Sequence, residues 1–429
     1  MKYTSTRGGL SGVDFEGVLF AGYAPDGGMF MPEHVPKLDR DTLQLWSSHS
    51  YRDLVKEVCS LFISPEAIPR NDLNDLIDKA FLRFRHEDVV PVARLESGLN
   101  VLEMWHGATH AFKDLSMSCV GQFLAYFLKM NNRHVNILVV DGTSDELDVP
   151  IKKFFEDTDF VRQHSIMSTN SVNWARVMVQ IAHFCHGYFQ CVPTTAGETL
   201  PQVEIVVPTG GAGNMTAGCI AQKMGLPIQL VAGVNRNDII HRTVQHGDFS
   251  LRDTEVTLAS AMDIQEPYNM ERILWLLSGA DSGRIKQMME EFNVKKRLQL
   301  PQELHQKLLG AMTSCSVTDD DILKTIRRCW EENRYLLCPH SAVATFYHYQ
   351  QFDSGNNKPR CCLAPASAAK FQDVILRANL TPEIPQEIIA LMEKETRSIP
   401  LSKHDDWEKV LREKIESIGQ QRLQKHRQM

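Results

Sequence analysis

The chain has 429 residues, 43% of them hydrophobic and 23% charged, as in ordinary globular proteins of two or three domains. Its net charge of −7 leaves no basic footprint for nucleic acid. It has no apolar run long enough to span a membrane, and its N-terminus, MKYTSTRGGLSG, lacks the apolar core of a secretory signal.

The 10 cysteines are scattered and include no C-x-x-C pair. This pattern favours reduced thiols over a disulfide framework, so we expect a cytoplasmic or organelle-matrix protein. His183, Cys185 and His186 fall on one predicted helix, where packing is a better explanation than metal binding, and we expect no metal site.

The first half of the chain mixes amphipathic helices with short strands after a glycine-rich start. The spacing of apolar residues predicts helices at 51–63, 71–84, 112–130, 151–155 and 172–189. Strands are expected at 89–92, 101–104 and 135–140, and the last of these (VNILVV) is of the fully buried type.

In the second half, a buried strand at 203–207, a glycine turn, a helix at 215–224 and a strand at 228–233 predict a parallel βαβ unit. Further on we expect a strand at 360–363 and helices at 319–333 and 369–377. The pattern predicts an α/β protein with at least two parallel-sheet domains. We place the boundaries at 1–90 (helical and loop region), 91–190 (smaller domain), 191–380 (large domain) and 381–429 (charged helical tail).

The segment VVPTGGAGN at 206–214 predicts an anion site, because small residues before a helix N-terminus expose backbone N–H groups. Thr216 replaces the third glycine of the dinucleotide fingerprint, and Asn235 stands where an acidic ribose ligand would follow. A monophosphate is therefore favoured, with a bare tight turn as the alternative. The candidate ligands are Gly210, Gly211, Ala212, Gly213 and Asn214.

Lys113 lies in HGATHAFKDLS (106–116), at a predicted helix start among apolar and aromatic residues. Desolvation lowers the pKa of a lysine and makes its neutral amine available for a Schiff base. Most lysines at helix starts are simply solvated. The phosphate-type loop changes the balance, because an aldehyde cofactor with a phosphate handle needs both features.

Together these motifs resemble the threonine synthases, which are fold-type-II pyridoxal-phosphate enzymes, and most closely the threonine synthase-like proteins. The resemblance covers most of the chain, in order: YTSTRG at 3–8, APDGGMFMPE at 24–33, HGATHAFKD at 106–114, STNSVNWAR at 168–176, the phosphate loop at 206–227, AMDIQEPYNMER at 261–272 and CPHSAV at 338–343.

The resemblance implies pyridoxal 5'-phosphate as cofactor, bound by Lys113 through a Schiff base and by the glycine loop through its phosphate. It also implies that Asn170, Asn173 and Arg176 shape the pocket for a phosphorylated substrate. On the residues alone, the alternative for Asn170 is a helix cap, and the alternative for Arg176 is a surface salt-bridge partner.

Three departures from the family pattern stand out. The strand at 135–140 runs into DGTSDE (141–146) instead of the Ser-Gly-Asp-Thr-Gly turn that receives the substrate carboxylate. A strand–turn–helix unit, about 30 residues or more, is therefore missing, and we expect a shortened smaller domain. In LAPASAAKF (363–371), Pro365 replaces a threonine that faces the ring nitrogen, and Ser367 is the nearest substitute. Tyr268 replaces a serine.

The leading hypothesis is a phospho-lyase that eliminates phosphate from O-phosphothreonine, O-phosphohomoserine or O-phosphoserine, giving a 2-oxo acid and ammonia. One alternative is a catalytically impaired isoform that acts as a binding or interaction protein, because the carboxylate turn is missing. Threonine synthase proper is another, and a deaminase or racemase of unphosphorylated amino acids a further one. We expect a monomer or homodimer.

Overall fold

The computed structural model describes residues 1–133, 135, 137, 144–192, 200–395, 400–402 and 404–427. The strand expected at 135–140 therefore lies outside the described residues, apart from Val135 and Ile137. The domain boundaries drawn from the sequence stay a prediction.

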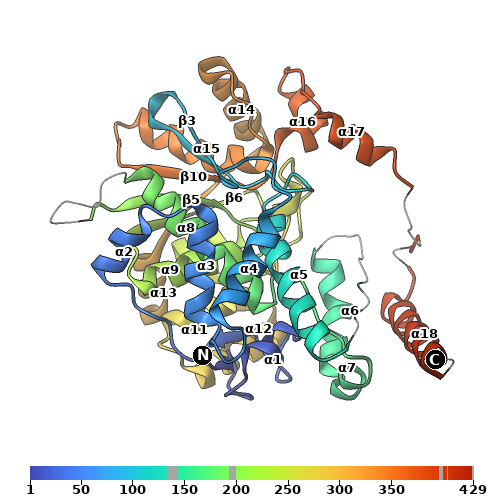
Figure 1. Ribbon diagram of the computed structural model, residues 1–429. Coiled ribbons are helices and arrows are strands. Elements are labelled where there is room, and N and C mark those ends of the chain that lie inside the picture. The colour runs from blue at the N-terminus through green and yellow to red at the C-terminus, as the bar shows by residue number, and fades with distance from the viewer. Residues whose placement is uncertain are drawn as a thin grey trace.

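A six-stranded sheet forms the centre of the molecule (Figure 1). Its strands lie in the order β3 (Val92–Arg94), β4 (Asn100–Glu103), β10 (Arg360–Ala364), β5 (Val203–Pro208), β6 (Ile228–Val234) and β9 (Met312–Ser316). All neighbours pair in parallel except β3, which runs antiparallel to β4. Two small antiparallel sheets pair β1 (Tyr3–Ser5) with β2 (Phe30–Pro32) and β7 (Asp248–Ser250) with β8 (Arg297–Gln299).

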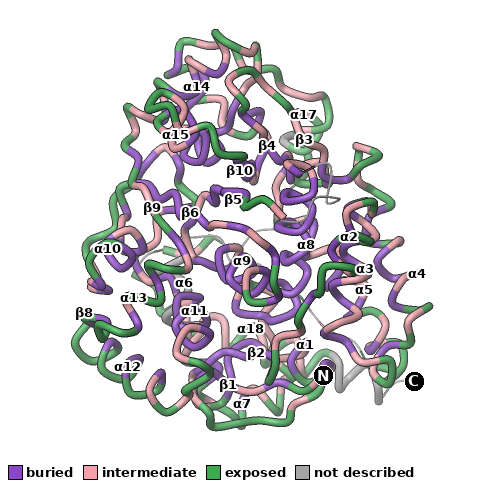
Figure 2. The backbone as a smooth tube through the Cα atoms, turned by 90° about the vertical axis from the view of Figure 1, so that its left-hand side faces the viewer, coloured by how far each residue is buried: buried purple, intermediate pink, exposed green. Residues whose placement is uncertain are grey.

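Both faces of this sheet are covered by helices, as expected for a parallel sheet (Figure 2). Successive side chains of β5 point to opposite faces, so Ile205 and Val207 join one hydrophobic cluster while Val206 joins the other. The first face packs against α8 (Trp174–Cys191) and α9 (Gly213–Met224). The second packs against α15 (Pro339–Asp353), which in turn contacts α14 (Asp319–Asn333).

Strands β10 and β5 are joined by a buried ion pair as well as by their ladder. Arg360 and Glu204 are register partners, and the Arg360 Nε donates to the Glu204 carboxylate at 2.8 Å. The Arg360 side chain is 1% exposed and that of Glu204 9% exposed. Removing either partner would leave a buried charge unpaired, which makes this pairing between the two strands specific.

The N-terminal third of the chain supplies α1 (Phe15–Leu19), α2 (Arg40–Trp46), α3 (Tyr51–Phe62), α4 (Arg70–Phe81) and α5 (Lys113–Met130). Of these, α1, α3 and α5 pack against α8, and α4 packs against α3 and α5. The remaining helices are α6 (Ser144–Glu156), α7 (Thr158–His164), α10 (Ile239–His246), α11 (Met270–Leu277), α12 (Ser282–Lys295), α13 (Gln302–Ala311), α16 (Gln372–Arg377), α17 (Gln386–Met392) and α18 (Trp407–Arg427), with short 3-10 turns η1 (Glu96–Gly98), η2 (Ser260–Met262) and η3 (Ala368–Lys370).

The C-terminal helix α18 lies against α6 and α7, at the side of the molecule in Figure 1. Its Arg412 donates to Asp157 at 2.9 Å and lies 4.4 Å from the centre of the Phe160 ring. The charged tail is thus two helices, α17 and α18, and the second packs beside the part of the chain where the sequence departs from the family.

The α/β class and the parallel βαβ unit β5–α9–β6 are confirmed. The expected strand at 89–92 is wrong except at its last residue, because Val89 has a φ of 64°, which no strand accommodates. Strands β3 and β4 join the large sheet, although they come from the segment assigned to the smaller domain. Helix α6 is longer than the expected 151–155 and contains Pro150.

We predict that the protein loses stability steadily on acidification, because burial keeps several histidines neutral. Burial lowers the pKa of His183 to about 3 and that of His186, His340 and His348 to about 4. In the unfolded chain each regains a pKa near the ordinary value of about 6.5. Between those values only the unfolded state binds the proton, so stability falls as pH falls from about 6.5 toward about 4.

Urea unfolding at pH 7, 6 and 5 measures this effect, which amounts to at most about 1.4 kcal/mol per pH unit for each histidine. In His348→Gln the pH dependence should become shallower by one such contribution. A free energy of unfolding that stays constant from pH 7 to 5 would contradict the prediction.

Candidate active site

The glycine loop follows β5 at the C-terminal edge of the sheet and leads directly into α9. Ala212, the residue before the helix, has a φ of 60°, and no side chain caps the first turn of α9. The first N–H groups of the helix therefore lack intrahelical partners and carry the positive end of its dipole. A Cβ at Gly210 would lie 3.1 Å from the Ala261 oxygen, so glycine keeps the loop open where the backbones approach.

Lys113 begins α5, and the turn before it is bonded to the segment that follows β10. The Phe112 N–H donates to the Pro365 oxygen at 2.7 Å, and the Ser367 N–H donates to the His110 oxygen at 3.1 Å. Ala111 and Ala366 form an isolated antiparallel bridge between these bonds. Because β10 and β5 are parallel neighbours, Lys113 and the glycine loop are held at the same edge of the sheet.

The surroundings of Lys113 favour its neutral amine. Part of the side chain is exposed to solvent. The pKa of the ammonium group is nevertheless lowered, mainly because the surrounding protein desolvates it and further because Arg176 and Lys370 repel it. The Lys370 ammonium donates to the Thr109 oxygen at 2.9 Å, on the loop that precedes Lys113. Because its pKa is lowered, the amine of Lys113 is a better nucleophile than that of an ordinary surface lysine.

Arg176 is a buried cation without a carboxylate partner among the described residues. Only 4% of the residue is exposed. Its Nε donates to the Ser116 hydroxyl at 2.9 Å, and its Nη1 donates to the Thr169 oxygen at 3.1 Å. Burial lowers the pKa of the guanidinium to about 10, so it remains charged at neutral pH. A buried charge of this kind is costly unless an anion approaches it.

A chain of hydrogen bonds links the lysine helix to the glycine loop. Arg176, bonded to Ser116 of α5, also accepts from the Gln180 amide at its own carbonyl, at 3.0 Å. The Gln180 Oε1 accepts from the Asn214 amide at 2.9 Å, in the first turn of α9. The Asn214 Oδ1 is buried without a partner among the described residues. Helices α5, α8 and α9 thus meet at one site.

The other predicted site residues lie nearby in different roles. Asn173 caps α8, accepting from the Ala175 N–H and donating to the carbonyls of Leu19, Ala21 and Ser168. Its amide is fully occupied by the protein. Asn170 is exposed and its carbonyl accepts from the Asn173 N–H. The Ser367 hydroxyl accepts from the Ala369 N–H at 3.3 Å.

Tyr268 closes the site beside the glycine loop. Its hydroxyl lies 2.6 Å from the Ser171 hydroxyl. The neighbouring Asn269 amide donates to the Gly211 oxygen at 3.1 Å, and a Cβ at Gly213 would lie 3.1 Å from the Ser171 Cβ. Tyr268, which replaces the serine of the family pattern, therefore contacts the segment 168–176.

Sequence reasoning missed His340 and Lys370 as site residues. His340 is 4% exposed, and its Nε2 accepts from the Ala261 N–H at 3.1 Å. The ammonium groups of Lys113 and Lys370 both act on its pKa. The sequence did carry a signal, because His340 lies within CPHSAV, one of the segments that resemble the family.

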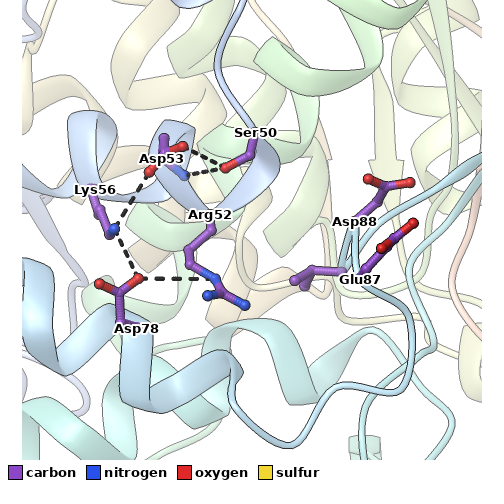
Figure 3. Close-up of a pocket in the computed structure, with 8 residues that line it drawn as sticks. Ser50, Arg52, Asp53, Lys56, Asp78, Glu87 and Asp88 are labelled. Carbon is purple, nitrogen blue, oxygen red and sulfur yellow. Dashed lines mark hydrogen bonds and ion pairs between the residues drawn. The ribbon is translucent and has the colours of Figure 1, made fainter.

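A separate charged pocket of about 300 Å³ lies between α3, α4 and the loop before β3 (Figure 3). Its two cations are paired with carboxylates: Lys56 lies 2.8 Å from Asp78 and 3.4 Å from Asp53, and Arg52 lies 3.9 Å from Asp78. None of the predicted site residues lines it, and we regard it as a paired surface network. Its lining residues are Ser50, Arg52, Asp53, Lys56, Asp78, Glu87, Asp88 and Val89.

Within the part of the chain that the structure describes, no three histidine, cysteine or acidic side chains gather as they would around a metal ion. Of the helices in that part, none is both long and apolar enough to cross a bilayer. All ten cysteines are free thiols.

Comparisons with known proteins agree on one family. The family described as "Threonine synthase N terminus" matches residues 2–81, and "Threonine synthase, C-terminal" matches residues 341–412. The threonine synthase-like 2 protein of Xenopus laevis is 65% identical over 475 aligned positions, covering 99% of this chain and 100% of the relative. The human threonine synthase-like 2 protein is 54% identical, covering 98% of each chain.

Solved structures show the same architecture. The PLP-bound threonine synthase of Brucella melitensis is 27% identical with a TM-score of 0.86, over 97% of this chain and 98% of that one. Yeast threonine synthase is 26% identical with a TM-score of 0.85, over 99% of each chain. The fold-type-II architecture is thereby confirmed, and the chain belongs to the threonine synthase family, with threonine synthase-like 2 proteins among its near relatives.

Proposed function

We propose that the chain binds pyridoxal 5'-phosphate and eliminates phosphate from O-phosphorylated hydroxy amino acids. The observation that carries this proposal is the placement of a lysine with a lowered pKa and an uncapped glycine-loop helix at the same edge of one sheet. An aldehyde with a phosphate handle needs both groups in one site. The PLP-bound relative from Brucella melitensis supports the same cofactor.

The residues present fit this cofactor. The first turn of α9 offers unpaired N–H groups to the phosphate, and glycine at 210 leaves room where a Cβ would meet the Ala261 backbone. Two buried polar atoms, the Asn214 Oδ1 and the His340 Nδ1, lack partners among the described residues. Both atoms lie beside the glycine loop, so a ligand bound there could pair with them. Ser367 holds the turn that carries Lys113.

The substrate class follows from Arg176. Its guanidinium is buried, charged and without a carboxylate among the described residues, and its repulsion helps to lower the pKa of Lys113. A phosphate ester on the substrate side chain supplies the missing anion, and arginine binds phosphate in a fixed geometry. In this proposal Asn170 contacts the substrate from the exposed loop, while Asn173 positions that loop through its cap.

The bound cofactor supplies an electron sink that makes the substrate α-proton acidic. Lys113, as the neutral amine, takes that proton and can return it. Arg176 holds the phosphate as the carbon–oxygen bond breaks and charge develops on the leaving oxygen. The remaining enamine takes up water, so that the products are a 2-oxo acid, ammonia and phosphate.

We infer that the chain is a shortened form and that the shortening lowers its activity. The alignment with the Xenopus relative spans 475 positions, 46 more than the 429 residues of this chain. This supports the missing strand–turn–helix unit after the predicted strand at 135–140. Without its turn the substrate carboxylate loses a contact that fixes orientation. That loss favours simple elimination over threonine synthesis, which also needs controlled water addition, and it keeps a non-catalytic binding role as the second candidate.

Compartment and assembly are also part of the proposal. Ten free thiols favour a reducing compartment, which is the cytoplasm or an organelle matrix. We propose a monomer or homodimer.

Replacement of Lys113 tests the lysine assignment. We expect Lys113→Ala to lose the visible absorbance of the holoprotein and to release phosphate from O-phosphothreonine at least about 10³-fold more slowly, because the nucleophile and proton carrier is gone. Lys129→Ala, at an exposed lysine in the last turn of the same helix, is the matched control. Colour and turnover that persist in Lys113→Ala would rule out the assignment.

Replacement of Arg176 tests the substrate class. Arg176→Met should lower kcat/KM for O-phosphothreonine by roughly 30-fold or more, because the phosphate of the substrate would lose its cationic partner. The rate with unphosphorylated threonine should change much less. Equal losses on both substrates would mean that Arg176 only supports the fold, and a preference for threonine in the parent chain would favour a deaminase or racemase.

Restoring the missing segment tests the effect of the shortening. We expect the chain to release phosphate about 10²-fold or more slowly than a version that carries the Xenopus segment after residue 140, because positioning of the substrate is poorer. Bound colour without any turnover would favour the non-catalytic role, and equal rates would contradict the importance of the missing turn. Threonine formed from O-phosphohomoserine would identify a synthase instead.

A further inference from the structure

His340 lies in the first turn of α15, which Cys338 caps and Pro339 begins. Helix α15 packs on β10 and β5, so its first turn reaches the sheet edge where Lys113 and the glycine loop lie. The Ala261 peptide joins the two: its N–H donates to the His340 Nε2 at 3.1 Å, and its oxygen borders Gly210. His340 is thus built into the wall of the site.

The hydrogen bond from Ala261 fixes the tautomer of His340. A backbone N–H can only donate, so the Nε2 must accept and carries no proton. Burial, aided by the nearby Lys113 and Lys370 ammonium groups, lowers the pKa of His340 to about 4, and the ring is neutral at physiological pH. The single ring proton is therefore on Nδ1.

This Nδ1–H is a buried donor with no acceptor among the described residues. Leaving such a group unpaired costs free energy, which an acceptor on a bound ligand would recover. The ring of His340 lies 5.0 Å from that of Phe371, just beyond the turn that holds Lys113. His340 therefore lies beside both the glycine loop, through Ala261, and the segment after β10, through Phe371.

We propose that the His340 Nδ1–H donates a hydrogen bond to the ring nitrogen of bound pyridoxal 5'-phosphate. The inference rests on the cofactor site proposed above. The cofactor has three kinds of acceptor. The N-terminus of α9 would donate to the phosphate, and the ring hydroxyl is on the carbon next to the one that bears the aldehyde. The ring nitrogen is on the opposite side of the ring from the aldehyde and needs a separate donor.

The turn after β10 offers few other donors for the ring nitrogen. Pro365 has no N–H and no polar side chain. Ser367 is the rival, because its hydroxyl accepts from the Ala369 N–H but can still donate its own proton. A neutral imidazole holds its proton firmly, so a ring nitrogen bonded to His340 stays unprotonated. The cofactor is then a moderate electron sink, which is sufficient for elimination.

Three variants separate the possibilities. His340→Phe keeps an aromatic ring and removes the donor, whereas His340→Asn keeps an N–H near the position of Nδ1. Ser367→Ala removes the rival hydroxyl. Each is loaded with pyridoxal 5'-phosphate labelled with ¹⁵N in the ring, and the nitrogen chemical shift, the cofactor dissociation constant and the melting temperature of the apoprotein are measured.

We expect the parent chain, His340→Asn and Ser367→Ala to share the shift of a hydrogen-bonded, unprotonated nitrogen. His340→Phe should lose that shift and bind the cofactor roughly tenfold more weakly, with an apoprotein that melts no lower. An unchanged shift and affinity in His340→Phe would overturn the proposal, as would loss of the shift in Ser367→Ala.

Two further outcomes separate this proposal from the function on which it rests. Lys113→Ala loaded with labelled cofactor should keep the His340-dependent shift, because the bond to the ring nitrogen does not require the amine. A parent chain that binds no cofactor would overturn both proposals. A chain that binds cofactor with the expected shift but releases no phosphate would overturn the proposed activity alone.

Discussion

The parallel pairing of β10 with β5 is the constraint on which the rest of the site depends. It places the segment after β10, which is bonded to the turn of Lys113, next to the glycine loop that follows β5. The buried pair of Arg360 and Glu204 fixes the register of these strands, since any shift would strand a charge in the core. A lysine and a phosphate-type loop that lie almost a hundred residues apart thereby meet at one edge of one sheet.

Unbalanced positive charge gives this edge its chemistry. Lys113, Lys370 and Arg176 converge, and the described residues offer Arg176 no carboxylate. Among the other buried arginines, Arg360 is paired with Glu204, and Arg272 donates through Nε, Nη1 and Nη2 to oxygens of the protein. The bonds that the described residues offer Arg176 engage only its Nε and Nη1. We infer that the remaining donor of Arg176 is open to an anionic ligand.

The segment in which the sequence departs from the family pattern leads into helix α6, which starts at Ser144. Helix α18 packs against α6 and α7, and its Arg412 lies over the rings of Phe154 and Phe160. The C-terminal helix thus covers the two helices that follow this segment. The groups that we propose to hold the cofactor lie on α5, α9 and α15, which precede or follow this region and pack on the large sheet or on α8.

The sequence by itself determined the class of the fold, the βαβ unit and the two chemical ends of the site, because periodicity and local glycine chemistry act over a few neighbouring residues. It indicated Lys113 and the loop 210–214 for the same reason. It could not place β3 and β4 in the large sheet or assign His340, because those depend on which distant strands and helices become neighbours. It predicted Asn173 as a pocket residue, and the structure adds that its Oδ1 caps α8 while its amide donates to three carbonyls. Only the tertiary structure decided which polar atoms are satisfied by the protein and which are left for a ligand.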